Sequence, residues 1–118
     1  MFEKDLRMDY LLDFYGEILP DRTREIMEQY YEDDLSLGEI ADSFGITRQA
    51  IRHVIKKGEQ TVLRMEEALG LAARFTALAE AVDTIRKDAD ELMGHKDPTV
   101  RKAAEAIVSQ IEQIERQL

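Results

Sequence analysis

The spacing of small and apolar residues between positions 37 and 54 constrains the fold more than any other feature of this chain. Ala41 stands where two crossing helices need a small side chain, and Gly45 stands where a tight turn needs a positive φ angle. The apolar residues that pack beneath the turn and lock the second helix onto the first are Ile46, Ile51 and Val54. Together these residues predict a helix-turn-helix.

The second helix of this motif carries a dense run of hydrogen-bond donors, with no carboxylate before Glu59. The candidate nucleic-acid-binding residues are Arg48, Gln49, Arg52, His53, Lys56 and Lys57. Ile51, Val54 and Ile55 are expected to face inward, which places Arg48, Gln49, Arg52 and Lys56 together on the outward face. Arginine binds guanine or phosphate with a planar fork, glutamine pairs with adenine, and lysine positions the phosphate backbone. The alternative is a helix-turn-helix that serves only as a fold or as a protein-binding surface.

The formal net charge of −9 taken alone argues against nucleic acid, but its distribution favours a local basic surface. Residues 1–46 hold 13 acidic and four basic side chains, whereas residues 47–64 hold five basic and one acidic. Residues 65–118 hold eleven acids and seven bases. Because the Debye length at physiological salt is roughly 8 Å, a basic helix can still dock on a phosphate backbone. The acidic remainder should weaken non-specific binding and suit basic protein partners.

The composition excludes several classes of function. The 118 residues, with 44% hydrophobic and 35% charged side chains, suit one small helical domain or slightly more. No cysteine is present, so disulfides, thiolate zinc sites and thiol nucleophiles are ruled out. Glu3 and Asp5 stand where a signal peptide needs positive charge, and no apolar run is long enough to span a membrane. We therefore expect a cytoplasmic protein without membrane insertion.

Two helices are expected before the motif. The first should run from about Lys4 to Leu19, with much of its circumference covered by two adjacent apolar stripes. These stripes are Leu6, Tyr10, Phe14 and Ile18, and Met8, Leu12, Tyr15 and Leu19. Pro20 suits the first turn of the second helix, which should end near Tyr31. The buried face of this second helix should contain Ile26, Met27, Tyr30 and Tyr31.

The helices of the motif carry their own start signals. Ser36 with Glu39 three residues later predicts a capping box, and Thr47 should cap the helix after the turn. Nothing breaks that helix before Gly58 and Gly70.

The C-terminal part contains two heptad patterns. Its apolar positions are Leu71, Phe75, Leu78, Val82, Ile85, Ala89 and Leu92, then Val100, Ala104, Ile107, Ile111, Ile114 and Leu118. Gly94 follows the first of these helices, Asp97 should cap the second, and Pro98 should lie in its first turn. Such helices should pack as an antiparallel hairpin. Because a hairpin alone buries little, it should also pack on the N-terminal unit or on a second copy, and we favour a homodimer.

The predicted fold is therefore all-α and divides into two parts. Residues 1–64 should form the helix-turn-helix unit, and residues 65–118 should form the dimerising hairpin.

Other residues with chemical potential have simpler interpretations. His53 is better explained as a hydrogen-bonding surface residue than as a metal ligand, and His95 as a solvated loop residue. The acidic segment 32–34 reads as a solvated turn rather than as a catalytic cluster, because no nucleophile or phosphate-binding loop accompanies it. Tyr30 and Tyr31 could stack on a base, although helical spacing places at least one of them in the core. We expect no enzyme activity, metal or cofactor.

Several stretches resemble the YlxM-like family of small bacterial helix-turn-helix proteins. They are Arg7–Tyr15, Tyr30-Tyr31, Asp33-Asp34, Ser36–Ala41 and Arg48-Gln49-Ala50, and together they cover roughly residues 6–57. Members of this family are encoded beside the signal recognition particle GTPase. The resemblance therefore implies a cytosolic accessory or regulatory factor of that protein-targeting pathway. A tyrosine-aspartate pair is usual in the family where this chain has Arg52-His53, so this version is more basic.

The motif is also similar to the promoter-reading domain of sigma factors. Thr47–Arg52 looks like the start of their recognition helix, which implies base-edge and phosphate roles for Arg48, Gln49, Arg52 and His53. A core-polymerase-binding region is not recognisable, so the chain is not a complete sigma factor.

The expected function is a non-enzymatic, nucleic-acid-binding factor tied to the targeting pathway through DNA or through the particle's RNA. One alternative is an adaptor that holds the targeting GTPase with acidic surfaces. A transcriptional regulator unrelated to targeting is a second alternative.

Overall fold

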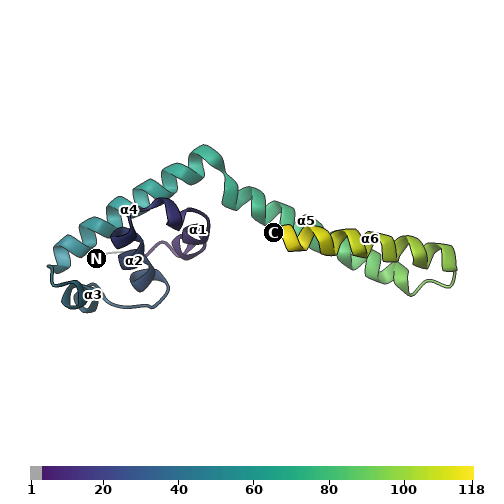
Figure 1. Cartoon of the computed structure of the whole chain (residues 1–118), viewed down its shortest axis with the longest axis horizontal. Coiled ribbons are helices and arrows are strands. Elements are labelled where there is room, and N and C mark those ends of the chain that lie inside the picture. Colours follow the sequence, from purple (N-terminus) through teal and green to yellow (C-terminus); the bar gives the residue numbers. More distant parts are fainter. Residues whose placement is uncertain (1–3) are drawn as a thin grey trace. The chain divides into compact units, whose positions relative to one another are not determined.

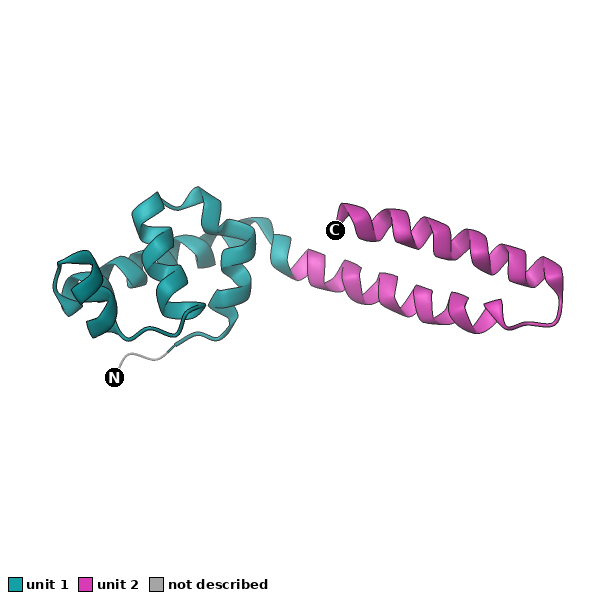
Figure 2. Cartoon of the chain, turned by 60° about the horizontal axis from the view of Figure 1, so that its bottom comes forward, with its two compact units in different colours: residues 1–72 teal, residues 73–118 magenta. Residues whose placement is uncertain are grey.

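The computed structural model describes residues 4–118, and this part of the chain contains helices and no strand. The all-α prediction is confirmed. The chain divides into two compact units, of which the first ends at Ala72 and the second begins at Ala73 (Figure 1, Figure 2). The sequence pattern placed this division after Arg64. Within the described residues no helix is both long and apolar enough to cross a membrane, and Glu3 lies outside them.

The first expected helix is shorter than its apolar pattern indicated. Helix α1 spans Arg7–Tyr15, a short 3-10 helix η1 follows at Gly16–Ile18, and α2 spans Asp21–Tyr31. Pro20 precedes α2 in an extended conformation (ψ 143°) instead of occupying its first turn. The prediction of one helix to Leu19 is therefore wrong. Glycine is a poor helix residue, and at Gly16 the chain tightens into the 3-10 turn.

One of the two apolar stripes of α1 is buried, and the other is only partly covered. The stripe that contains Met8, Leu12 and Tyr15 lies in the core. Leu6 and Ile18, in the other stripe, are 85% and 52% exposed. The expectation that both stripes would be covered is met only in part: Phe14 packs half-buried against the core, whereas Tyr10 is 40% exposed.

Helix α3 spans Leu37–Phe44 and begins with the predicted capping box. The Ser36 side chain accepts a hydrogen bond from the Glu39 N–H, and the Glu39 carboxylate accepts one from the Ser36 N–H. The helix ends at Gly45, whose φ of 69° is the left-handed conformation that the sequence predicted. The chain then passes directly from the C-terminal end of α3 into the turn.

Helix α4 spans Arg48–Leu69 and is the central element of the first unit, with α1, α2 and α3 on one side of it (Figure 1). Its side chains Ile51, Ile55 and Val62 are fully buried. The helix continues through Gly58, and packing explains why a glycine occupies this position: a Cβ there would clash with the Met27 Sδ of α2. The absence of a side chain lets α2 and α4 cross closely.

A polar cluster closes the end of α4. Gly70 has a φ of 63° and ends the helix. The Tyr15 hydroxyl donates to the Glu66 Oε1 at 2.6 Å and accepts from the Leu71 N–H at 3.1 Å. The Ala72 N–H donates to the same Glu66 oxygen at 3.0 Å. These bonds tie α1 to the start of the next helix.

The second unit is the expected helical hairpin. Helix α5 spans Leu71–Met93 and α6 spans Pro98–Gln117, and the two lie side by side and antiparallel (Figure 2). Asp97 caps α6 by accepting from the Thr99 N–H at 2.9 Å, and Pro98 lies in the first turn as predicted. Arg86 of α5 forms ion pairs with Glu112 and Glu115 of α6.

Replacing Gly58 with alanine should destabilise the first unit. Met27 is fully buried, so its sulfur would have to shift within the core to make room for a Cβ at position 58. We expect Gly58→Ala to lower the free energy of unfolding by about 1–3 kcal/mol, as overpacked cores do, despite the better helix propensity of alanine. Urea unfolding monitored by circular dichroism measures this. The control is Gly94→Ala, where the nearest contact of a Cβ is the Glu91 carbonyl at 3.7 Å; equal stability of both variants would contradict the account.

Candidate nucleic-acid interface

The turn between α3 and α4 fixes where the basic residues begin. Thr47 caps α4, since its hydroxyl accepts from the Ala50 N–H at 3.0 Å, as predicted. The Ile46 N–H donates to the Ala41 carbonyl at 3.2 Å, and Ile46 packs half-buried against the core. The side-chain cap and the backbone hydrogen bond together hold the first turn of α4 in one orientation relative to α3.

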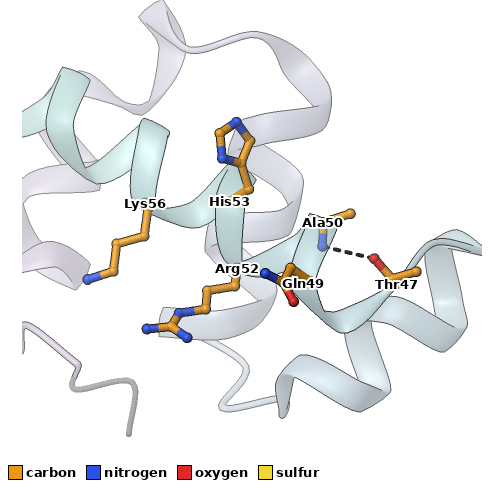
Figure 3. A pocket seen from close by; sticks show the side chains of 6 residues that line it. All are labelled: Thr47, Gln49, Ala50, Arg52, His53 and Lys56. Carbon is orange, nitrogen blue, oxygen red and sulfur yellow. Dashed lines mark hydrogen bonds between the residues drawn. The ribbon is translucent and has the colours of Figure 1, made fainter.

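The inward and outward faces of α4 follow the sequence prediction. Ile51 and Ile55 are fully buried, and Val54 packs against the core from a half-buried position. The opposite face contains an open depression of about 490 Å³. It is lined by Thr47, Gln49, Ala50, Arg52, His53 and Lys56 (Figure 3). Arg52 and Lys56 extend from the helix in the same general direction, whereas His53 points away from them (Figure 3).

Lys57 faces a different part of the surface. It lines a second cavity of about 360 Å³, together with residues from the start of α2 and the middle of α4. The other lining residues are Leu19, Pro20, Thr23, His53, Val54, Gly58 and Thr61. His53 lies at the border, because it lines both hollows.

Arg48 also stands apart from the depression. It is exposed, and its guanidinium lies over Gly38 in the first turn of α3. A Cβ on Gly38 would lie 3.0 Å from the Arg48 Nε and 3.1 Å from its Nη2. The six candidate residues are thus all exposed. Gln49, Arg52, His53 and Lys56 line the depression, whereas Arg48 and Lys57 do not.

The single carboxylate in the basic segment points away from it. Glu59 is buried, and its Oε2 accepts a hydrogen bond from the Tyr31 hydroxyl at 2.6 Å. Its Oε1 is buried without a hydrogen-bond partner among the described residues. Burial raises the pKa of Tyr31 far above its usual value, and the hydrogen bond to Glu59 adds to this effect. Because this carboxylate is directed into the core, it does not neutralise the outward face of α4.

Two tyrosine–glutamate pairs were missed by the sequence analysis. They are Tyr31–Glu59 and Tyr15–Glu66. The signal was present in the spacing: both glutamates fall on the apolar stripe of α4 that contains Ile51, Ile55 and Val62. A glutamate on such a stripe needs a buried donor, and tyrosine on a facing helix supplies one.

The remaining candidates behave as ordinary structural residues. Tyr30 and Tyr31 are 8% and 7% exposed, so neither is available to stack on a base. His95 is exposed, and its Nδ1 accepts from the Asp97 N–H at 3.1 Å. No group of histidine and carboxylate side chains suited to a metal ion occurs in the described part of the chain.

An acidic surface lies at the C-terminal end of α2. Glu32, Asp33 and Asp34 are exposed, as the solvated-turn interpretation requires, and Asp34 is paired with Lys4 at 3.0 Å. Partial burial raises the pKa of Glu32, and nearby carboxylates of α1 and α2 add to this effect. The contributing neighbours are Glu28, Asp9, Asp13 and Asp33. Acidic side chains from two helices therefore converge there.

The fold and the exposed basic face define a helix-turn-helix protein, and comparison with known proteins identifies the family. Residues 2–116 match the model of the UPF0122 family, helix-turn-helix proteins that are YlxM / p13 like. A UPF0122 protein of Halalkalibacterium halodurans is 42% identical over 91 residues, which cover 77% of this chain and 84% of the relative. A UPF0122 protein of Thermoanaerobacter sp. is 38% identical over 110 residues, 92% of this chain and 94% of the relative. The chain belongs to this family.

Stability should fall as the pH rises above 10, and Tyr31 should account for part of the loss. Burial raises the pKa of Tyr31 in the folded chain, so the unfolded chain releases this proton first. The stabilisation is complete below the unfolded pKa of about 10 and is lost above it. We expect Tyr31→Phe to reduce the slope of unfolding free energy against pH by up to about 1.4 kcal/mol per pH unit. Urea unfolding on both sides of pH 10 measures the slope, and identical slopes for the variant and the wild type would contradict the prediction.

Proposed function

We propose that the chain is a non-enzymatic nucleic-acid-binding protein that uses the outward face of α4. The observation that carries the proposal is the open depression lined by Gln49, Arg52 and Lys56, and Glu59 of the same helix is directed away from it into the core. Membership in a helix-turn-helix family favours the same conclusion. An α-helix fits the major groove of duplex DNA, and its exposed side chains there meet base edges and phosphates.

The proposed roles differ among the candidate residues. Arg52 and Gln49 lie in the first two turns of α4, where recognition helices contact base edges, and both have side chains suited to bidentate contacts. Lys56 lies one turn further along and is proposed to neutralise a phosphate. His53 and Lys57 are proposed to contact the backbone beside this group, since they line the neighbouring cavity.

We propose further that this factor serves the signal recognition particle pathway in the cytoplasm. The proposal rests on the YlxM-like resemblance, and it makes the particle's RNA the first ligand to test and promoter DNA the second. A transcriptional regulator unrelated to targeting would bind only the DNA. No cofactor is required for either role.

The acidic surface favours one alternative, an adaptor that holds the basic targeting GTPase. Its support is the convergence of carboxylates from α1 and α2 around Glu32. Reversing the charges of Glu32, Asp33 and Asp34 should then abolish capture of the purified GTPase by the chain. The nucleic-acid proposal expects this triple variant to bind RNA and DNA at least as well as the wild type.

We also propose that two copies of the chain act together. The support is the half-exposed heptad residues of the hairpin, which a single copy leaves without a partner surface among the described residues. A pair would present two α4 surfaces to one nucleic acid.

Removing the Arg52 guanidinium should weaken binding of nucleic acid. We expect Arg52→Ala to raise the Kd by about tenfold or more and to reduce the slope of log affinity against log salt by about one if the lost contact is to phosphate. Fluorescence anisotropy with labelled bacterial signal recognition particle RNA and with a short duplex DNA measures both quantities.

The matched control is Arg64→Ala, which removes an exposed arginine from the same helix outside the proposed surface. It should retain wild-type affinity. If Arg52→Ala binds both probes like the wild type, or if the wild type binds neither, the proposed function is wrong.

A further inference from the structure

The hairpin leaves half of its heptad residues exposed. Within α5, Val82 and Ala89 are buried against α6, and within α6, Ala104 and Ile111 are buried in return. The alternate apolar positions are 38–48% exposed, although they have the same heptad spacing. These residues, which we call the open face, are Leu78, Ile85, Leu92, Ile107 and Ile114.

The open face lies on one side of the hairpin. Successive residues of a helix are rotated by about 100° around its axis. Leu78 and Ile85 therefore lie to one side of the stripe of α5 that faces α6, and Asp83 and Asp90 lie to its other side. In the same way, Ile107 and Ile114 lie to one side of the stripe of α6 that faces α5, and Glu105 and Glu112 lie to its other side. Because the helices are antiparallel, both apolar sets turn to the same side, and both acidic sets turn to the other. The hairpin is therefore apolar on one side and charged on the other.

The structure assigns a second copy of this chain as the partner of the open face. On the α6 side, the face is bordered by Ala103, Gln110 and Gln117, none of which is charged. On the α5 side the border contains Arg74, Ala81 and Asp88, one charge of each sign, so the border has no net charge. Identical copies of a chain of net charge −9 can therefore approach there without net repulsion. A basic foreign partner would instead be attracted to the charged side of the hairpin.

The size of the face fits a dimer. Helices of 23 and 20 residues are about 30 Å long, and two helices packed about 10 Å apart present a face roughly 20 Å wide. Joining two such faces buries on the order of 1,200 Å² in total, which reaches the lower limit for specific interfaces. The product is a four-helix bundle with heptad packing.

This assignment rests on the proposed pairing of two copies and names the surface that joins them. The oligomeric state tests it without any nucleic acid, so the outcome is independent of the proposed nucleic-acid binding. Sedimentation equilibrium should give twice the 13.6 kDa mass of one chain. The double variant Ile85→Ala with Ile114→Ala should weaken the dimer at least about tenfold, while alanine keeps both helices intact by circular dichroism. The control pair, Asp83→Ala with Glu105→Ala on the charged side, should remain dimeric. A monomeric wild type, or a double variant as dimeric as the wild type, would overturn the assignment.

A separate observation concerns Gly38 and Arg48. Helix α3 has a glycine at its second position, and a Cβ there would make a tight contact of 3.0 Å with the Arg48 Nε. In helix-turn-helix complexes the first helix of the motif crosses the phosphate backbone, while the second enters the groove. A guanidinium that lies over α3 is therefore placed toward the backbone and away from base edges.

We infer that Gly38 is a positioning residue that holds Arg48 as a phosphate clamp. This inference rests on the proposed nucleic-acid function and assigns Arg48 to the backbone, where the sequence left both guanine and phosphate open. A Cβ at position 38 would require the guanidinium to move by a few tenths of an ångström. The helix itself would gain stability, since alanine is a better helix residue than glycine.

The test is Gly38→Ala, for which stability and binding should change in opposite directions. We expect the melting temperature to rise or stay constant, the Kd for duplex DNA to rise several-fold, and the salt slope to fall by up to about one, without a change in sequence preference. In Arg48→Ala, the added Gly38→Ala should have no further effect on the Kd, as a double-mutant cycle would show. Wild-type binding by Gly38→Ala alongside weakened binding by Arg52→Ala would overturn the clamp and leave the proposed function standing.

Discussion

The close crossing of α2 and α4 is the contact on which the rest of the first unit depends. Gly58 lets Met27 sit directly against the backbone of α4, and the buried stripe of Ile51, Ile55 and Val62 follows from that approach. Once this face is packed in the core, the helical period determines which side chains lie on the opposite face. The direction of Arg52 and Lys56 is thus a consequence of core packing.

Helix α4 combines a core and a surface in one continuous element. Its buried stripe includes two glutamates, and each is held by a tyrosine from α1 or α2. Directing Glu59 inward keeps the outward face cationic in a chain that is acidic as a whole. The Glu59 Oε1 accepts no hydrogen bond from the described residues, and a buried acceptor left without a partner generally costs about 1–3 kcal/mol.

Much of the fold could be predicted because its signals are local. Ser36, Gly45, Thr47 and Asp97 act through backbone groups within a few residues of themselves, so their roles follow from the sequence. The end of α1 and the choice between its two apolar stripes depend on which face α2 and α4 cover. The close approach of the Arg48 guanidinium to α3 depends on Gly38, ten residues earlier in another helix, so no helical period predicts it. Contacts of this kind, between residues of different helices, could not be predicted from the sequence pattern.

The central claim is that nucleic acid binds the outward face of α4. Titration of the isotopically labelled chain with signal recognition particle RNA and with duplex DNA, followed by amide NMR, tests this residue by residue. The account predicts that the largest shifts occur at Gln49, Arg52 and Lys56 with at least one of the two ligands. Shifts concentrated on the acidic surface at Glu32–Asp34, or no shifts with either ligand, would contradict it.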